Sequence, residues 1–232
     1  MLRSVMPELL DELPADDPHA IRSRRDLKTV NTLMGTADIM ASALLQGPRV
    51  RRPDTLVELG AGDGTLLLEI ARRLAPNWNG LRAVLVDQQP LVTAQTCAQF
   101  EALSWHVESV QADVLQWLRE RAAHTVDVTL ANLFLHHFGE RDLGVLLHEV
   151  ARQTRTFLAC EPRRSRPALA TAAMLGLVGC NRVTVHDATI SVRAGFRDHE
   201  LSAVWPRATW MLTEGEAGRF AHIFRAEHAS QL

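Results

Sequence analysis

The chain has 232 residues, of which 47% are hydrophobic and 22% are charged, and its formal net charge is -2 at pH 7. This length and composition predict one globular domain, with at most a short appendage. A nearly neutral chain has no broad basic field to hold a nucleic-acid backbone, and no apolar run reaches the roughly 20 residues of a membrane helix. We therefore expect neither a nucleic-acid partner nor a membrane partner.

The number and spacing of the cysteines indicate the redox state of the compartment. Cys97, Cys160 and Cys180 are odd in number and widely spaced. This pattern predicts free thiols in a reducing cytoplasm, with neither a disulfide framework nor a zinc signature. We expect a cytoplasmic protein without a bound metal, and the sequence leaves the oligomeric state open, a homodimer included.

Helices are expected before the first strand. Asp17 followed by Pro18 is typical of an N-cap and a first helical position, so a short helix is predicted through Arg25. Residues 26–46 carry apolar side chains at three- and four-residue steps, which predicts one amphipathic helix. The pair Gly47-Pro48 is expected to end that helix.

From Thr55 onwards, strand patterns alternate with helix patterns. The predicted strands are 55–59, 82–87, 107–111, 126–131 and 156–160. The predicted helices between and after them are 65–75, 90–103, 115–122 and 142–153. Apolar strands that alternate with helices indicate an α/β fold, a parallel sheet with helices on both faces.

The last third of the chain is less regular. A helix is predicted over 168–178, a loop-rich segment over 181–200, and a further helix near 198–204. Two final strands are predicted at 208–213 and 219–226. A hairpin around Glu214-Gly215-Glu216 is expected to join them.

The first strand runs into a glycine-rich turn. Glu58 lies near the end of the strand, and Gly60, Gly62 and Gly64 follow it. Glycine allows the sharp turn and a close approach of the backbone to a ligand. The dinucleotide fingerprint needs its third glycine one position later, where Thr65 stands. An acid beside this turn would repel a pyrophosphate, whereas it suits a cationic ligand.

The stretch Glu58-Leu59-Gly60-Ala61-Gly62-Asp63-Gly64 resembles the first motif of class I methyltransferases, whose cofactor is the sulfonium S-adenosylmethionine. The resemblance implies a doubly wound, seven-stranded, mostly parallel sheet, the Rossmann-like methyltransferase fold, which ends in an antiparallel strand pair. It also implies that Glu58, Gly60, Ala61 and Gly62 contact the cofactor.

The resemblance further implies a division of the chain. Residues 1–48 would form an N-terminal helical cap, and residues 49–232 the methyltransferase domain. A lid over the substrate and a helix packed on the edge of the sheet remain two open interpretations of residues 1–48.

The predicted strand ends carry the other cofactor candidates. Asp87, with Gln88 beside it, lies roughly 20–25 residues after the glycine turn, where an acid reaches ribose hydroxyls. The resemblance implies that Asp113 accepts from the adenine amino group, that the backbone of Val114 meets the ring, and that Asn132 lies at the methionine end. Helix N-capping remains an alternative role for each aspartate.

Paired histidines follow the fourth predicted strand. The segment from Asn132 to Phe138 resembles one in small-molecule methyltransferases of bacterial secondary metabolism, some acting on polyketide phenols. The resemblance implies O-methylation of a small aromatic hydroxyl, and His136, His137 or His186 are the candidate bases. A carbon or nitrogen acceptor, a non-catalytic S-adenosylmethionine-binding partner protein and, least favoured by the glycine spacing, a nicotinamide oxidoreductase remain alternatives.

Overall fold

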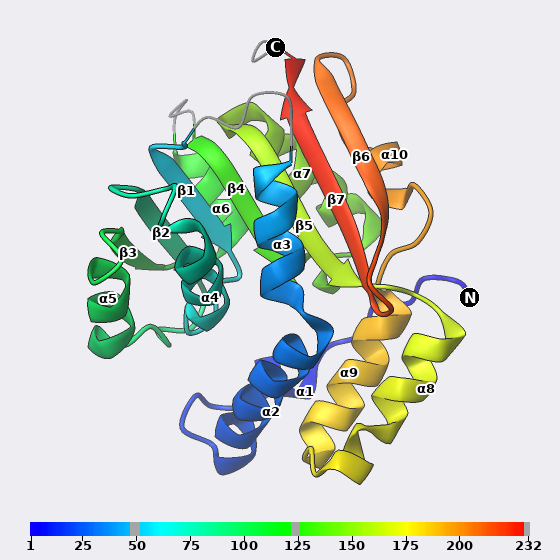
Figure 1. The fold of residues 1–232 in the computed structure, drawn as a ribbon. Coiled ribbons are helices and arrows are strands. Elements are labelled where there is room, and N and C mark those ends of the chain that lie inside the picture. Colours follow the sequence, from blue (N-terminus) through cyan, green and yellow to red (C-terminus); the bar gives the residue numbers. More distant parts are fainter. Residues whose placement is uncertain (47–51, 122–125, 230–232) are drawn as a thin grey trace.

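The computed structural model of the protein describes residues 1–46, 52–121 and 126–229 (Figure 1). Within them, one sheet contains seven strands: β1 (Thr55–Leu59), β2 (Arg82–Asp87), β3 (His106–Gln111), β4 (Val126–Asn132), β5 (Thr154–Pro162), β6 (Trp210–Ala217) and β7 (Ala221–His228). Their spatial order is β3-β2-β1-β4-β5-β7-β6. The first five strands are parallel, while β7 is antiparallel to β5 and to β6. The predicted seven-stranded, mostly parallel sheet is confirmed.

The strand order reverses direction beside β1. The chain moves outwards from β1 to β2 and β3, and then returns to place β4 on the other side of β1. In open parallel sheets, ligands bind in the crevice at such a reversal, beyond the carboxyl ends of the strands. We therefore expect a ligand site among the residues that follow β1, β2 and β4.

Helices cover both faces of the sheet (Figure 1). In chain order they are α1 (Leu9–Glu12), α2 (Pro18–Met34), α3 (Thr36–Leu45), α4 (Thr65–Leu74), α5 (Ala94–Glu101), α6 (Val114–Glu120), α7 (Glu140–Gln153), α8 (Arg166–Met174), α9 (Arg182–Ala194) and α10 (Glu200–Val204), with short 3-10 turns η1 (Leu135–His137) and η2 (Leu175–Val178). Helices α3, α4 and α5 contribute to the core on one face, and α6, α7 and α10 to the core on the other. No helix in the described ranges is both long and apolar enough to cross a bilayer.

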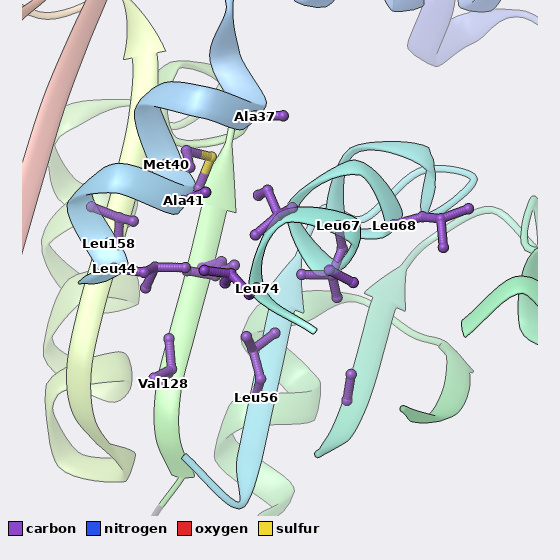
Figure 2. Close-up of a cluster of buried hydrophobic side chains, with 14 of the residues drawn as sticks. Ala37, Met40, Ala41, Leu44, Leu56, Leu67, Leu68, Leu74, Val128 and Leu158 are labelled. Atoms are coloured by element: carbon purple, nitrogen blue, oxygen red, sulfur yellow. The ribbon is translucent and has the colours of Figure 1, made fainter. Parts of the chain in front are cut away.

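Figure 2 shows the apolar contact that joins helix α3 to the sheet. Met40 and Leu44 of α3 lie in one buried cluster with Leu74 of α4 and Leu56 of β1. Burying a side chain of this size contributes roughly 1.5–3 kcal/mol. Helix α3 is thus part of the core of the sheet. The boundary predicted between residues 48 and 49 lies outside the described residues, and the division there stays a prediction.

The single helix predicted over 26–46 is wrong. Gly35 has φ 66°, and its N–H donates to the carbonyls of Asn31 and Thr32, which ends α2 and lets α3 begin at Thr36. Left-handed backbone is accessible to glycine at little cost, so this glycine is the breaking point. Helix α2 also begins earlier, at Pro18, as the capping residue Asp17 predicts. The predicted stop at Gly47-Pro48 lies outside the described residues.

The loop-rich interpretation of 181–200 is wrong as well, because residues 182–194 form α9. Its β-branched residues have low helix propensity, which hid the helix from the sequence pattern. Asn181 caps the helix by accepting from the N–H of Thr184, and Val183, Thr184 and Ile190 are buried. Tertiary packing therefore overrides the weak local preference.

The predicted hairpin turn is also misplaced. Strand β6 continues through the predicted turn to Ala217, and the reversal falls at Gly218, which has φ 61°. Glu214 stays within the strand because its buried carboxylate accepts from His222 on β7 and from the N–H groups of Leu201 and Ser202 on α10. The remaining predicted strands and helices agree with the structure except near their ends. The largest such shift is at α5, which begins at Ala94 and is capped by Thr93.

Candidate active site

A cavity of about 600 Å³ opens at the carboxyl ends of β1, β2 and β4. Helix α2 and the segment before it supply a further wall of this cavity, from Glu8 to Gly35. Every residue predicted to bind the cofactor lines it: Glu58, Gly60, Ala61, Gly62, Asp87, Gln88, Asp113, Val114 and Asn132. The structure thus brings together side chains from four separate strand ends.

The glycine turn is held against β2. The N–H groups of Gly60 and Ala61 donate to the carbonyl of Val86 at 2.9 and 3.1 Å. Gly60 has φ 68°, and a Cβ there would lie 2.3 Å from the ring of Phe134, whereas a Cβ on Gly62 would meet nothing within 4 Å. The backbone of this turn therefore packs closely at Gly60 and lies open to the cavity at Gly62.

Asp87 fixes the end of the same turn. One carboxylate oxygen accepts from the N–H of Gly62 at 2.8 Å, and the other accepts from the N–H of Gln89 at 2.8 Å. Asp87 does not cap α5, because Thr93 takes that role. Each oxygen retains a second lone pair, so the carboxylate can still accept hydrogen bonds from ligand hydroxyls.

Asp113 combines the two roles that the sequence left open. Its carboxylate caps α6 by accepting from the N–H of Gln116 at 2.9 Å, and it also accepts from the side chain of Gln88 at 3.1 Å. Asp113 nevertheless lines the same cavity as Asp87. Both carboxylates therefore face one ligand-sized space.

Glu58 is a buried acid with an unsatisfied oxygen. It is 2% exposed, and its Oε2 has no hydrogen-bond partner among the described residues. Burial, followed by the charges of Asp87 and Asp63, raises the pKa of Glu58 to about 8. A positive charge placed in the cavity would favour the ionised form of this carboxyl.

Two further buried oxygens on this cavity lack partners in the described structure, Oδ1 of Asn31 and Oδ1 of Asn132. An unsatisfied buried acceptor costs about 1–3 kcal/mol. Three such acceptors around one cavity fit a ligand that carries positive charge and several hydrogen-bond donors, as S-adenosylmethionine does. Asn31 on α2 was not among the residues predicted for the site.

The candidate base His136 does not line the cavity. Its Nδ1 lies 2.8 Å from Oε2 of Glu161, and its Nε2 lies 3.1 Å from Oε1 of Glu8. Burial by itself lowers the pKa of His136, but the hydrogen bonds and charges of the two glutamates outweigh it and raise the pKa to about 9. An imidazolium between two carboxylates has no free lone pair. The structure therefore argues against His136 as the general base.

Glu161 organises the turn that carries the paired histidines. It is fully buried at the end of β5, and its Oε1 accepts from the N–H groups of Phe134 and Leu135 at 3.0 and 2.8 Å. Its other oxygen orients His136. No pattern in the sequence indicates that this one carboxylate holds the whole turn.

The other two histidines lie in different environments. His137 lines the cavity, and its Nδ1 is 3.2 Å from a carboxylate oxygen of Asp11. His186 lies on α9 outside the cavity lining, so the structure does not bring it over the pocket as predicted. Its neighbour Asp187 accepts from the N–H groups of Leu9 and Leu10, each at 2.9 Å. Of the three predicted bases, His137 alone reaches the cavity.

The sequence left open a lid formed by residues 1–48 but named none of the residues of this N-terminal wall. The wall contributes side chains before and along α2, namely Glu8, Leu10, Asp11, Arg24, Leu27 and Lys28. Lys28 forms an ion pair with Asp63 of the glycine turn at 2.5 Å, and Arg24 donates to Gln89 at 3.0 Å. These contacts join segments that are far apart in the chain, so no local sequence pattern predicts them.

The seven-stranded sheet with its reversed last strands, the glycine turn after β1 and the acids at the ends of β2 and β3 give the chain the Rossmann-like fold of class I methyltransferases. Residues 56–156 match the family model described as a methyltransferase domain. Within these residues the sequence is therefore similar to a methyltransferase domain. No curated protein matches the sequence.

Solved structures share the fold at low sequence identity. An O-methyltransferase family protein from Burkholderia thailandensis is 17% identical, with a TM-score of 0.60 over 93% of this chain and 64% of that chain. The mitomycin 7-O-methyltransferase MmcR is 19% identical, with a TM-score of 0.62 over 95% and 60%. The plantazolicin methyltransferase BamL is 8% identical, with a TM-score of 0.65 over 95% and 93%. The chain thus spans less than two thirds of the first two proteins and nearly all of the third.

Proposed function

We propose that this protein transfers the methyl group of S-adenosylmethionine to a small-molecule acceptor, an aromatic or phenolic hydroxyl. The observation that carries the proposal is the buried, unsatisfied carboxyl of Glu58, which faces a cavity with two other unpartnered oxygens. Structural neighbours named as O-methyltransferases, one acting on mitomycin, support the hydroxyl as acceptor. The cofactor supplies an already activated methyl group, so the protein must supply alignment.

The cofactor is proposed to lie along the strand ends. Asp87, with Gln88, would hold the ribose hydroxyls, and Asp113 would accept from the adenine amino group while the backbone of Val114 meets the ring. The backbone from Gly60 through Ala61 to Gly62 would pass beneath the ribose and methionine. The oxygens of Glu58 and Asn132 would face the cationic end. Each of these groups lines the cavity in the structure.

The acceptor is proposed to bind at the end of the cavity that His137, Phe134 and Phe138 share with Leu10. The two phenylalanine rings lie 5.0 Å apart in an edge-to-face arrangement, which gives an aromatic acceptor an apolar contact surface. The imidazole of His137 would take the proton of a neighbouring hydroxyl as the hydroxyl oxygen takes the methyl carbon. The carbon–sulfur bond of the cofactor breaks in the same step.

The test is calorimetry with S-adenosylhomocysteine and, separately, with NADH. We expect S-adenosylhomocysteine to bind and NADH not to bind. Binding of NADH alone would overturn the methyltransferase proposal. A panel of phenols, amines and activated carbon acceptors, read by mass spectrometry for a gain of one methyl group, tests the acceptor. Methylation of the amines or carbon acceptors alone would indicate N- or C-methylation in place of O-methylation. Binding of S-adenosylhomocysteine without transfer to any acceptor would indicate a non-catalytic partner protein.

A further inference from the structure

We propose that Glu8, His136 and His137 form a binding site for a divalent transition-metal ion at the acceptor end of the cavity. Each residue offers one ligand atom, and these atoms all lie within 4.8 Å of one another. Two imidazole nitrogens and one carboxylate oxygen are a ligand set that zinc and its neighbours in the periodic table prefer. The sequence predicted no metal, because its three widely spaced cysteines show no zinc signature.

His136 is held in the orientation that a metal ligand needs. Its Nδ1 meets the fully buried carboxylate of Glu161 at 2.8 Å, so Nε2 points the other way, towards Glu8. Metal-binding histidines almost always give their second ring nitrogen to such a partner, which fixes the ring and its tautomer. Glu161 is itself fixed by two backbone N–H groups of the same turn, so the arrangement is rigid before any ion arrives.

The spacing of the ligand atoms suits an ion. Nε2 of His136 and Oε1 of Glu8 lie 3.1 Å apart. Two ligands that are each about 2.1 Å from a metal and subtend a right angle at it are about 3 Å apart. The ion can therefore take the place of the proton that otherwise joins these two atoms. The ring of His137 lies beside that of His136, with centroids 4.3 Å apart.

The site is open on the side where an acceptor would bind. Glu8 and His137 line the cavity, whereas His136 and Glu161 are buried behind them. Asp11, 3.2 Å from His137, lines the cavity too and offers a further carboxylate. Arg3, whose guanidinium donates to the carbonyl of Phe138 at 2.9 Å, is the cation that faces Glu161 from the N-terminal segment. Three protein ligands with an open position are typical of catalytic metal sites.

The role of the ion rests on the proposed function. Glu8, His136 and His137 would hold the ion, and the ion would lower the pKa of an acceptor hydroxyl, so that the hydroxyl would give its proton to water as its oxygen takes the methyl carbon and the carbon–sulfur bond breaks. The products would be the methylated oxygen, neutral S-adenosylhomocysteine and one proton carried by water, so charge and atoms balance. In this arrangement His137 is a ligand, and the ion takes over the activation for which a base was predicted.

The experiment is a calorimetric titration of Zn²⁺ into untagged protein that has been stripped with a chelator. We expect one ion per chain with a dissociation constant of about 1 μM or tighter. His137→Ala and Glu8→Gln should each weaken binding by at least about 10-fold, while His186→Ala, outside the cluster, should leave it unchanged. Co²⁺ substitution separates these ligands from the free thiols, since thiolate ligation would add a sulfur-to-cobalt charge-transfer band.

Three results would contradict the proposed metal site. No binding, binding that survives both His137→Ala and Glu8→Gln, or a thiolate band would each overturn the metal site and leave the triad as a protonated clamp. His137→Ala removes a partly exposed ring outside the buried network, so its folding is not at risk, and a circular dichroism spectrum checks it. A parallel titration with S-adenosylhomocysteine reports on the methyltransferase proposal independently of the metal.

Discussion

At the scale of single residues, Glu58 is the side chain whose surroundings say most about the ligand. Its carboxyl is buried with one unpartnered oxygen, and its pKa is raised to about 8. A protein seldom keeps such an acid unless something binds it, because an orphaned buried acceptor costs stability.

Replacing Glu58 with glutamine mimics the protonated acid. Between the ordinary value of 4.5 and about 8, the folded wild type binds a proton that the unfolded chain has released. The unfolding free energy of the wild type therefore falls as pH rises through that window. Glu58→Gln should lack this slope, and thermal melts of the cofactor-free proteins at about pH 5.5, inside that window, and at about pH 8.5, above it, measure the difference.

The same variant tests the charge on the ligand. Glu58→Gln should weaken the binding of S-adenosylmethionine more than that of S-adenosylhomocysteine, because only S-adenosylmethionine carries the sulfonium charge. Calorimetry with both ligands gives the ratio. Equal losses for the two would place the carboxyl against a group that both ligands share, and parallel pH profiles for variant and wild type would contradict the raised pKa.

Asp87→Ala should lower the affinity for S-adenosylhomocysteine by about 10- to 100-fold, since a hydrogen bond to a charged group contributes about 1.5–3 kcal/mol. The matched control is Asp127→Ala. Asp127 also accepts from two backbone N–H groups, those of Asp54 and Thr55, but at the amino end of the strands. The control variant should leave the affinity for S-adenosylhomocysteine unchanged. An unchanged affinity in Asp87→Ala would show that Asp87 does not bind the ribose.

At the scale of elements, the strands and the glycine turn were predictable because their signals are local. A buried apolar run and three alternating glycines are written in consecutive residues, and β1 begins and ends where the pattern placed it. Helix α9 and the break at Gly35 were not predictable in this way. Packing stabilises α9 despite its β-branched residues, and a glycine in a helical pattern is often tolerated.

The glycine turn offers a matched pair of variants. Gly60 and Gly62 both have positive φ, so alanine at either position is strained by about 1 kcal/mol. At Gly60 the added methyl also collides with Phe134, which adds about 1–3 kcal/mol of overpacking.

Gly60→Ala should therefore lower the melting temperature more than Gly62→Ala does. Gly62→Ala, whose methyl enters the open cavity, should keep the fold and lose affinity for S-adenosylhomocysteine. Thermal melts and calorimetry on both variants are the measurements. Equal destabilisation would mean that Phe134 moves aside freely.

At the scale of the whole molecule, the N-terminal segment forms one wall of the cavity and is held there by contacts with residues much later in the sequence. Glu8 contacts His136 and Ser191, and the first turn of α1 is fastened to Asp187 of α9. Figure 1 shows α1 and α2 beside α8 and α9 at one end of the sheet. Helix α2 lines the cavity and α3 joins the core, while the role of residues 1–48 as a cap over the substrate stays a prediction.

Asp187→Ala should release that segment. Two backbone N–H groups lose a charged acceptor, so amide exchange at residues 9 and 10 should accelerate by about 10- to 100-fold. Hydrogen exchange followed by mass spectrometry measures this. His186→Ala keeps both acceptors and is the control. Unchanged exchange in Asp187→Ala would show that other contacts hold the segment.

The sequence by itself determined the parallel sheet, the glycine turn and the order of the acids that follow the strands, because strand periodicity and glycine geometry act over a few neighbouring residues. Only the tertiary structure decided which histidine meets the cavity. His136 and His137 are adjacent in sequence, yet Glu161 and Glu8 bury one ring while the other faces the ligand space. The side to which each ring turns depends on carboxylates more than 20 residues away on either side, and contacts at that separation exist only once the chain has folded.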